Sequence, residues 1–209
     1  MPTFNQDSEE IQYLCTKDPL LAKGIALVGS LSYMNETDGF PFLGNIIVSQ
    51  MLSAKVADVI WARLVLLCDG KFDIETVKKL EINQMRAIGL SNRKAQNILN
   101  LASYLLEHPQ FLEDFAILGD EEIVNELTAL KGIGPWTAKM YLIFALDRRD
   151  VLPYEDGAFL QAYRWLYRTE DLSVSSIKKC CEPWTPYASL ASRYLYRLLD
   201  LGFTKEGRA

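Results

Sequence analysis

The sequence predicts an all-α protein built as two helical lobes. Apolar residues recur three and four positions apart along most of the chain, the spacing that places them on one face of a helix. No segment alternates β-branched and polar residues as a strand would. With 209 residues, 49% of them hydrophobic, the chain can bury a substantial core as one domain or two closely packed lobes.

Seven segments carry the helical spacing, in the order Ile46 to Leu67, Ile74 to Leu80, Arg93 to Leu106, Ile123 to Leu130, Trp136 to Leu146, Phe159 to Tyr167 and Leu190 to Leu201. Residues that end or start helices separate these segments, at Gly70, Gly89, His108-Pro109, Gly119-Asp120, Lys131 to Pro135, Asp147 to Asp156 and Pro183 to Pro186.

Two loops are the candidate crossings between the lobes. They are the polar turn around Asn35 to Gly39 and the loop from Arg148 to Pro153. We therefore expect one lobe formed by residues 1–40 and 151–209, and a central lobe formed by residues 41–150.

Composition excludes several classes of protein. The four cysteines show no metal-binding spacing and His108 is the only histidine, which argues against a zinc site or a histidine-centred triad. We expect reduced, buried thiols. The N-terminus lacks a secretory signal pattern and no apolar run reaches the ~20 residues that span a bilayer, so we expect a cytoplasmic protein without membrane contact.

The stretch "LKGIGPWTAKM", Leu130 to Met140, predicts two helices joined by a glycine hairpin. The glycines can adopt positive φ, and Pro135 suits the first position of the second helix. Backbone N–H groups of such a hairpin can hold a phosphate oxygen without basic side chains, which matters in a chain of net charge −5. For Gly-x-Gly-Pro alone, an ordinary turn between two helices is an equally good interpretation.

The surrounding sequence resembles the helix-hairpin-helix (HhH-GPD) superfamily of DNA glycosylases, and within it the 3-methyladenine DNA glycosylase II branch. Besides the hairpin, the resemblance rests on four stretches in family order: "IIVSQMLSAKVADVIWARL" (Ile46 to Leu64), "MRAIGLSNRKAQNILNLA" (Met85 to Ala102), "DVLPYEDGAF" (Asp150 to Phe159) and "EPWTPYASLASRYLY" (Glu182 to Tyr196). These stretches span most of the chain after residue 40. The resemblance implies an active-site cleft between the two lobes and DNA contacts at Lys131, Gly132, Ile133, Gly134 and Thr137.

Asp156 matches the essential carboxylate of the family, twenty residues after Trp136. Taken alone, an Asp before Gly-Ala-Phe is most simply a helix N-cap, and the two roles are compatible. The helix from Trp136 to Asp147 rises roughly 17 Å. The nine residues that follow, at up to ~3.3 Å each, are long enough to bring Asp156 back beside the hairpin.

A carboxylate near the anomeric carbon can stabilise the positive charge that develops on the sugar when the N-glycosidic bond breaks, and can orient or deprotonate the attacking water. An alkylated purine already carries positive charge and leaves readily, so one carboxylate is sufficient and no metal is required. Relatives that also cut the strand have a lysine nucleophile where this chain has Trp136. The resemblance therefore implies a monofunctional enzyme. The adjacent Cys180 and Cys181 do not match the iron–sulfur loop of other relatives.

Aromatic residues are the candidates for recognising a cationic base, through cation–π attraction and stacking. Trp136 and Trp184 match base-pocket positions of the alkylation-repair branch, and Tyr154, Tyr141 and Phe42 are weaker candidates. A core anchor is the alternative for any single tryptophan, and we assign Trp61 and Trp165 to that role.

Gln50 and Met51 stand where relatives place residues that probe DNA from the minor groove, and Met51 is a candidate wedge that fills the space left by a flipped base. A core methionine is the alternative. The chain departs from many relatives in having Ala188-Ser189 in place of Arg-Ser, and Arg193 is a candidate substitute for the missing arginine.

The sequence thus predicts a monomeric base excision repair enzyme that acts on double-stranded DNA containing damaged bases and needs no cofactor. A monovalent cation on the hairpin carbonyls, found in some relatives, is left open. Two other functions also remain open: a non-catalytic helix-hairpin-helix DNA-binding module, and a monofunctional glycosylase for uracil or mismatched bases.

Overall fold

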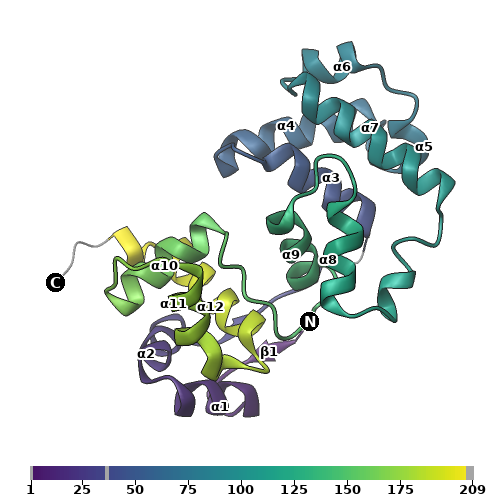
Figure 1. Ribbon diagram of the computed structural model, residues 1–209. Helices are drawn as coiled ribbons and strands as arrows, with labels where there is room; N and C mark the ends of the chain where they lie inside the picture. Colours follow the sequence, from purple (N-terminus) through teal and green to yellow (C-terminus); the bar gives the residue numbers. More distant parts are fainter. Residues whose placement is uncertain (1, 36–37, 206–209) are drawn as a thin grey trace. The chain divides into compact units, whose positions relative to one another are not determined.

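The computed structural model of the chain describes residues 2–35 and 38–205. The chain divides into two compact units: Met1–Asn35 with Leu146–Ala209 forms unit 1, and Glu36–Ala145 forms unit 2 (Figure 1). The sequence placed these boundaries after residues 40 and 150. The predicted crossing around Asn35 to Gly39 contains residues 36 and 37, which lie outside the described residues.

Unit 1 is helical apart from a ribbon of two short antiparallel strands, β1 (Thr3–Phe4) and β2 (Leu31–Ser32), in which Phe4 pairs with Leu31. Its helices are α1 (Glu9–Lys17), α2 (Pro19–Val28), α10 (Gly157–Tyr167), α11 (Val174–Cys181) and α12 (Ala188–Asp200), with 3-10 turns at Glu182–Trp184 and Phe203–Lys205. The amphipathic α12 packs against α10 and α2 and supplies Tyr194, Leu195 and Leu198 to the core.

A buried carboxylate, Asp18, ties three parts of unit 1 together. It is 7% exposed and caps α2, where its Oδ1 accepts hydrogen bonds from the N–H groups of Leu20 (3.0 Å) and Leu21 (2.9 Å). Its Oδ2 accepts from Trp184 Nε1 at 2.9 Å and from the Tyr167 hydroxyl. Burial, followed by this bond to Asp18, raises the pKa of Tyr167. Asp18 thus joins α2, α10 and the turn that carries Trp184.

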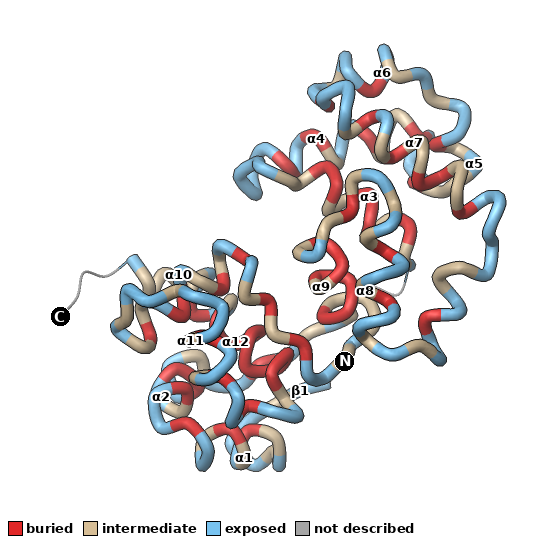
Figure 2. The backbone as a smooth tube through the Cα atoms, viewed as in Figure 1, coloured by how far each residue is buried: buried red, intermediate tan, exposed pale blue. Residues whose placement is uncertain are grey.

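Unit 2 contains the 3-10 turn Asp114–Ala116 and the helices α3 (Gly39–Ser49), α4 (Ala54–Leu67), α5 (Ile74–Val77), α6 (Ile82–Ala87), α7 (Asn92–Glu107), α8 (Asp120–Thr128) and α9 (Pro135–Phe144). The core lies around α9, where Thr137, Ala138 and the run from Met140 to Ile143 are buried (Figure 2). Helices α3, α7 and α8 pack against their neighbours in this unit, with α3 contacting both α7 and α9.

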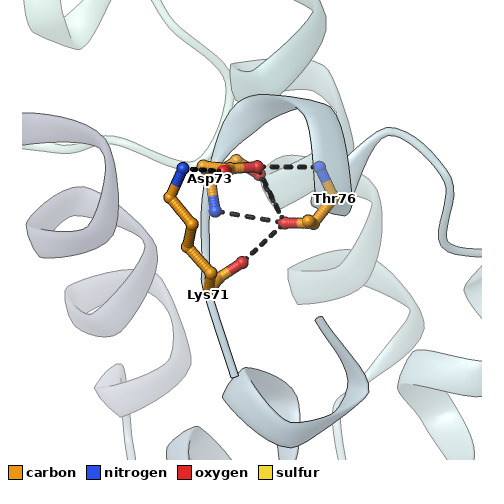
Figure 3. A network of polar contacts seen from close by, with 3 residues as sticks. All are labelled: Lys71, Asp73 and Thr76. Carbon is orange, nitrogen blue, oxygen red and sulfur yellow. Dashed lines mark hydrogen bonds and ion pairs between the residues drawn. The ribbon is translucent and has the colours of Figure 1, made fainter. Parts of the chain in front are cut away.

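The short helix α5 is stabilised by a capping box. Asp73 Oδ1 accepts from the N–H of Thr76 at 2.9 Å, Thr76 Oγ1 accepts from the N–H of Asp73 at 3.2 Å, and Lys71 Nζ lies 2.8 Å from Asp73 Oδ2 (Figure 3). The bond with Lys71, followed by those with Thr76, lowers the Asp73 pKa from 3.8 to about 2. The stabilisation from this cap is therefore complete above pH 3.8 and is lost as the pH falls toward 2.

The structure confirms the all-α class and corrects three details. The segment from Ile46 to Leu67 is two helices, because the chain turns at Gln50–Ser53 and Met51 has a φ of 57°. The segment from Ile74 to Leu80 forms only the four-residue α5. Four helices, α1, α2, α6 and α11, were not predicted. Within the described range, no helix combines the length and apolar character needed to cross a membrane.

Asp18→Ala should destabilise unit 1 by about 3 kcal/mol, because it removes a cap and leaves the buried indole of Trp184 and the half-buried hydroxyl of Tyr167 without their acceptor. Urea denaturation measures this loss. Asp73→Ala, which removes an N-cap at a half-buried site in unit 2, is the control and should cost less. Equal losses in the two variants would refute the role of Asp18 as a buried tie.

Candidate functional site

The predicted glycine hairpin lies between α8 and α9 in unit 2. Gly132 has a φ of 92°, a conformation that side-chain-bearing residues rarely adopt. Gly134 is the N-cap of α9 and Pro135 occupies its first position, as the sequence predicted. Ile133 is buried, which anchors the tip of the hairpin, whereas Lys131 is exposed. The first turn of α9 directs its N–H groups toward the hairpin end, as at any helix N-terminus.

Close packing against α7 is a second reason for glycine at position 132. A Cβ added to Gly132 would lie 2.2 Å from the Asn97 side-chain nitrogen and 2.8 Å from its Cβ. A Cβ added to Gly134 would have no neighbouring atom within 4 Å. The two glycines therefore have different functions: Gly132 permits the turn and the approach of α7, and Gly134 leaves open space beside the start of α9.

The turn between α3 and α4, Gln50–Ser53, carries the candidate wedge. Met51 is 97% exposed and has a φ of 57°, so its side chain is fully presented to solvent by an unusual backbone conformation. This exposure excludes the core-methionine alternative. No sequence pattern indicates this left-handed backbone, because the apolar spacing continues through the turn.

Gln50 connects this turn to the hairpin. Its Nε2 donates to the carbonyl oxygen of Gly132 at 2.9 Å and to Thr137 Oγ1 at 3.4 Å. Thr137 is 1% exposed, so the hydroxyl is an internal contact of the hairpin. The structure thus brings Gln50, Met51 and the hairpin together in one surface of unit 2, which we call the hairpin–turn surface. The predicted role of Gln50 in probing DNA stays a prediction.

The aromatic candidates of unit 2 differ in exposure. Tyr141 is buried, and its ring contacts those of Phe42 (centroids 5.8 Å apart) and Phe115 (6.0 Å). Burial, followed by the charge of Asp38, raises the pKa of Tyr141 to about 12. Phe42 and Trp136 are half-buried and keep accessible surface. Among these three, Trp136 and Phe42 are therefore the better placed to meet a base.

Asp156 is the N-cap of α10 in unit 1, as its sequence context predicted. Its Oδ1 accepts a hydrogen bond from the N–H of Phe159 at 2.7 Å, and the residue is 8% exposed. Tyr196 of α12 also hydrogen-bonds the Asp156 carboxylate; burial, followed by the charge of Asp156 and this hydrogen bond, raises the pKa of Tyr196. The carboxylate is thus held by a helix N-terminus and a phenol. Tyr196 has no distinguishing signal in the sequence, because its spacing is the same as that of the residues on the core face of α12.

The loop that leads to Asp156 is fastened to the start of α12. Ser189 Oγ accepts from the N–H of Val151 at 3.0 Å, and the N–H of Ser189 donates to the carbonyl oxygen of Arg149 at 3.0 Å. Asp150 accepts from the N–H of Ala188 at 3.3 Å. Residue 188 therefore makes this contact through its backbone N–H, which alanine provides as well as any other residue except proline.

Tyr154, two residues before Asp156, is half-buried, and Lys178 Nζ lies 4.9 Å from the centre of its ring. Its ring therefore already contacts a cation in unit 1.

Trp184 is a core anchor in this structure and not a pocket-lining residue. Its side chain is 0% exposed, its Nε1 is bonded to Asp18, and its ring lies edge-on to Phe159 with centroids 6.3 Å apart. A tryptophan without accessible surface has no face to offer a base. Trp165 and Trp61, which we assigned to the core, are half-buried, and Trp61 packs on Phe72 with centroids 4.8 Å apart.

Arg193, the candidate substitute for the family arginine, lies inside unit 1. It is 7% exposed, its guanidinium is 3.6 Å from the centre of the Tyr33 ring, and Nη2 donates to Asn35 Oδ1 at 3.0 Å. Nη2 is also 3.6 Å from Asp147 Oδ1. Arg193 therefore holds the two stretches of unit 1 from which the chain leaves for unit 2 and to which it returns.

The candidate site residues form two groups, one in each unit. The hairpin–turn surface belongs to unit 2, and Asp156 with Tyr154 and Tyr196 belongs to unit 1. The predicted position of Asp156 beside the hairpin stays a prediction. Among residues 2–35 and 38–205, no three His, Cys, Asp or Glu side chains gather in a way that could hold a metal ion.

Comparison with known proteins identifies the family. Residues 45–186 match the family model described as "HhH-GPD superfamily base excision DNA repair protein", and this range contains the hairpin, the Met51 turn and Asp156. The chain belongs to the HhH-GPD superfamily. It is 30% identical over 219 aligned residues to DNA-3-methyladenine glycosylase 1 of Schizosaccharomyces pombe, with 97% of this chain and 96% of that protein covered.

Solved structures of the superfamily share the fold. A DNA-3-methyladenine glycosidase from Bacillus halodurans is similar with a TM-score of 0.85 and 28% identity, over 99% of this chain and 95% of the other. The 3-methyladenine DNA glycosylase of Schizosaccharomyces pombe in complex with abasic DNA is similar with a TM-score of 0.84 and 28% identity, over 93% and 98% of the two chains. The resemblance inferred from sequence is therefore confirmed.

Gly132→Ala should destabilise unit 2 by about 1–3 kcal/mol, because it adds a Cβ at positive φ and against Asn97. Urea denaturation measures the change. Gly134→Ala is the matched control, since its φ of −104° is allowed for alanine and the space beside it is open. It should cost less than Gly132→Ala, because only the exchange of an N-cap glycine for alanine remains. Equal tolerance of the two substitutions would show that the contact with Asn97 imposes no constraint.

Proposed function

We propose that this chain is a monofunctional DNA glycosylase that flips alkylated purines of the 3-methyladenine type out of double-stranded DNA and hydrolyses the N-glycosidic bond, leaving an abasic site. The observation that carries the proposal is the buried, hydrogen-bonded carboxylate of Asp156 in a member of a base excision repair superfamily. The two Schizosaccharomyces pombe and Bacillus halodurans proteins compared above, which are similar over nearly the whole chain, are named for 3-methyladenine, and this supports the substrate class.

In the proposed mechanism, Asp156 acts electrostatically. Breaking the N-glycosidic bond leaves positive charge on the sugar, and a carboxylate already fixed by the N–H of Phe159 and by Tyr196 needs little reorganisation to stabilise it. The same group can orient or deprotonate the attacking water. The alkylated base leaves as a neutral molecule once its bond electrons return to the ring, so a strong general acid is unnecessary.

The hairpin–turn surface supplies DNA binding in this proposal. Backbone N–H groups at the start of α9 bind a phosphate, which suits a chain whose net charge is −5. Met51 enters the space vacated by the flipped base, and half-buried Trp136 offers a ring to the cationic purine. The protein acts as a monomer without a cofactor.

Asp156→Asn should reduce base release by at least about 10²–10³-fold, because it removes the negative charge that stabilises the transition state. Asparagine is as good an N-cap as aspartate, so α10 should be retained and abasic DNA should still bind. The assay measures free base released from DNA treated with a methylating agent. Glu155→Gln, which changes the exposed neighbouring carboxylate, is the control and should keep activity. Full activity of Asp156→Asn would remove the mechanism.

Wild-type protein should release 3-methyladenine from methylated DNA and leave the strand intact until alkali is added, because Trp136 occupies the position of the lyase lysine. Uracil- and 8-oxoguanine-containing duplexes, run in parallel, define the substrate range. Salt-sensitive binding without release of any base would instead indicate a non-catalytic DNA-binding module. Strand cleavage without alkali would contradict the monofunctional assignment.

A further inference from the structure

The turn that carries Met51 is held by a side chain from another helix. Lys94 lies in the first turn of α7, and its Nζ donates to the carbonyl oxygens of Val48 at 2.8 Å and Gln50 at 2.6 Å. Val48 belongs to the last turn of α3, and Gln50 is the C-cap of that helix. Carbonyl groups at the end of a helix lack partners within the helix. Lys94 thus fixes the end of α3 and the residue immediately before Met51.

Charge favours this arrangement, whereas burial opposes it. The helix dipole makes the C-terminus of α3 partly negative, which attracts an ammonium group. Lys94 is half-buried, and burial, followed by the positive charge of Arg93, lowers its pKa. Hydrogen bonds from a charged donor are stronger than those between neutral groups, so the two short bonds to carbonyls offset part of the loss of water around Nζ.

The same face of α7 also supports the hairpin. Asn97 follows Lys94 by three residues, which places both on one side of the helix. Asn97 packs against Gly132, while Gln50 bonds to the Gly132 carbonyl from the other loop. Helix α7 therefore contacts both loops of the hairpin–turn surface, and Lys94 is its connection to the loop that carries Met51.

Met51 itself needs such support. Its backbone is in the left-handed region, which non-glycine residues adopt only when their surroundings impose it, and its side chain is 97% exposed and so makes little contact of its own. The conformation must therefore be imposed through its neighbours in the chain, and Lys94 and the hairpin both act on Gln50.

We propose that Lys94 is a positioning residue that presents Met51 to duplex DNA: by bonding the carbonyls of Val48 and Gln50, it holds the wedge in the orientation needed to occupy the space of a flipped base. This inference rests on the proposed glycosylase function. It assigns Lys94 a role in base flipping and not in the bond-breaking step, because a single-stranded substrate requires little or no extrusion.

Lys94→Met keeps the aliphatic stem and removes the donors. The ratio of 3-methyladenine release from methylated duplex to release from methylated single-stranded DNA should fall by about tenfold to a hundredfold, the loss expected for a misplaced group. Lys94→Arg, which keeps donors for the carbonyls, should restore most of the ratio. Lys79→Met removes an exposed charge of the same unit and should leave the ratio unchanged. If Lys94→Met does not fold at the assay temperature, Lys94→Gln, with a shorter amide donor, takes its place.

The decisive measurement is a double-mutant cycle with Met51. Met51→Ala should lower the same ratio, and adding Lys94→Met to Met51→Ala should lower it little further, because both act on one wedge. Additive losses, or an equal fall on single- and double-stranded DNA, would overturn the inference. Absence of base release by wild-type protein on either substrate is a different result: it refutes the glycosylase proposal, and the inference with it.

Discussion

The contact between α7 and the backbone of Gly132 is the constraint on which the hairpin–turn surface depends. A side chain at position 132 would collide with Asn97, and its positive φ would be strained. Because α7 reaches the hairpin so closely, Lys94, one turn earlier, also reaches the end of α3. Gln50 closes the arrangement by bonding to Gly132 from the opposite loop. Two loops far apart in sequence thus form one surface, which suits simultaneous contact with a phosphate and a base stack.

Unit 1 uses two buried N-cap aspartates for different purposes. Asp18 receives donors from two backbone N–H groups, an indole and a phenol, and connects elements of the core. Asp156 is held in a related way by the N–H of Phe159 and by Tyr196. A buried carboxylate is tolerated only when hydrogen bonds replace its water. The same requirement that stabilises α2 through Asp18 therefore preorganises, at α10, a charge that our proposal assigns to catalysis.

An acidic chain can bind DNA through such a surface because the proposed phosphate donors are backbone groups. Net charge of −5 disfavours binding through a general basic field. Amide N–H groups at a helix start carry partial positive charge in a fixed direction, and a hairpin orients them without lysine or arginine. Lys94, which lies beside this surface, can then bond to backbone carbonyls within the unit.

The sequence by itself determined the all-α class, the glycine hairpin followed by Pro135, and Asp156 as a helix N-cap, because each depends on local backbone preferences and on residue spacing.

The tertiary structure decided what spacing does not encode. It broke the predicted helix from Ile46 to Leu67 at Met51, since contacts from Lys94 and the hairpin impose the left-handed turn that apolar periodicity passes over. It placed Trp184 in the core, where the indole N–H bonds to Asp18, a residue far away in the sequence. It brought Tyr196 to Asp156 across two packed helices. Such long-range contacts arise only when segments distant in sequence pack together, and no local pattern records them.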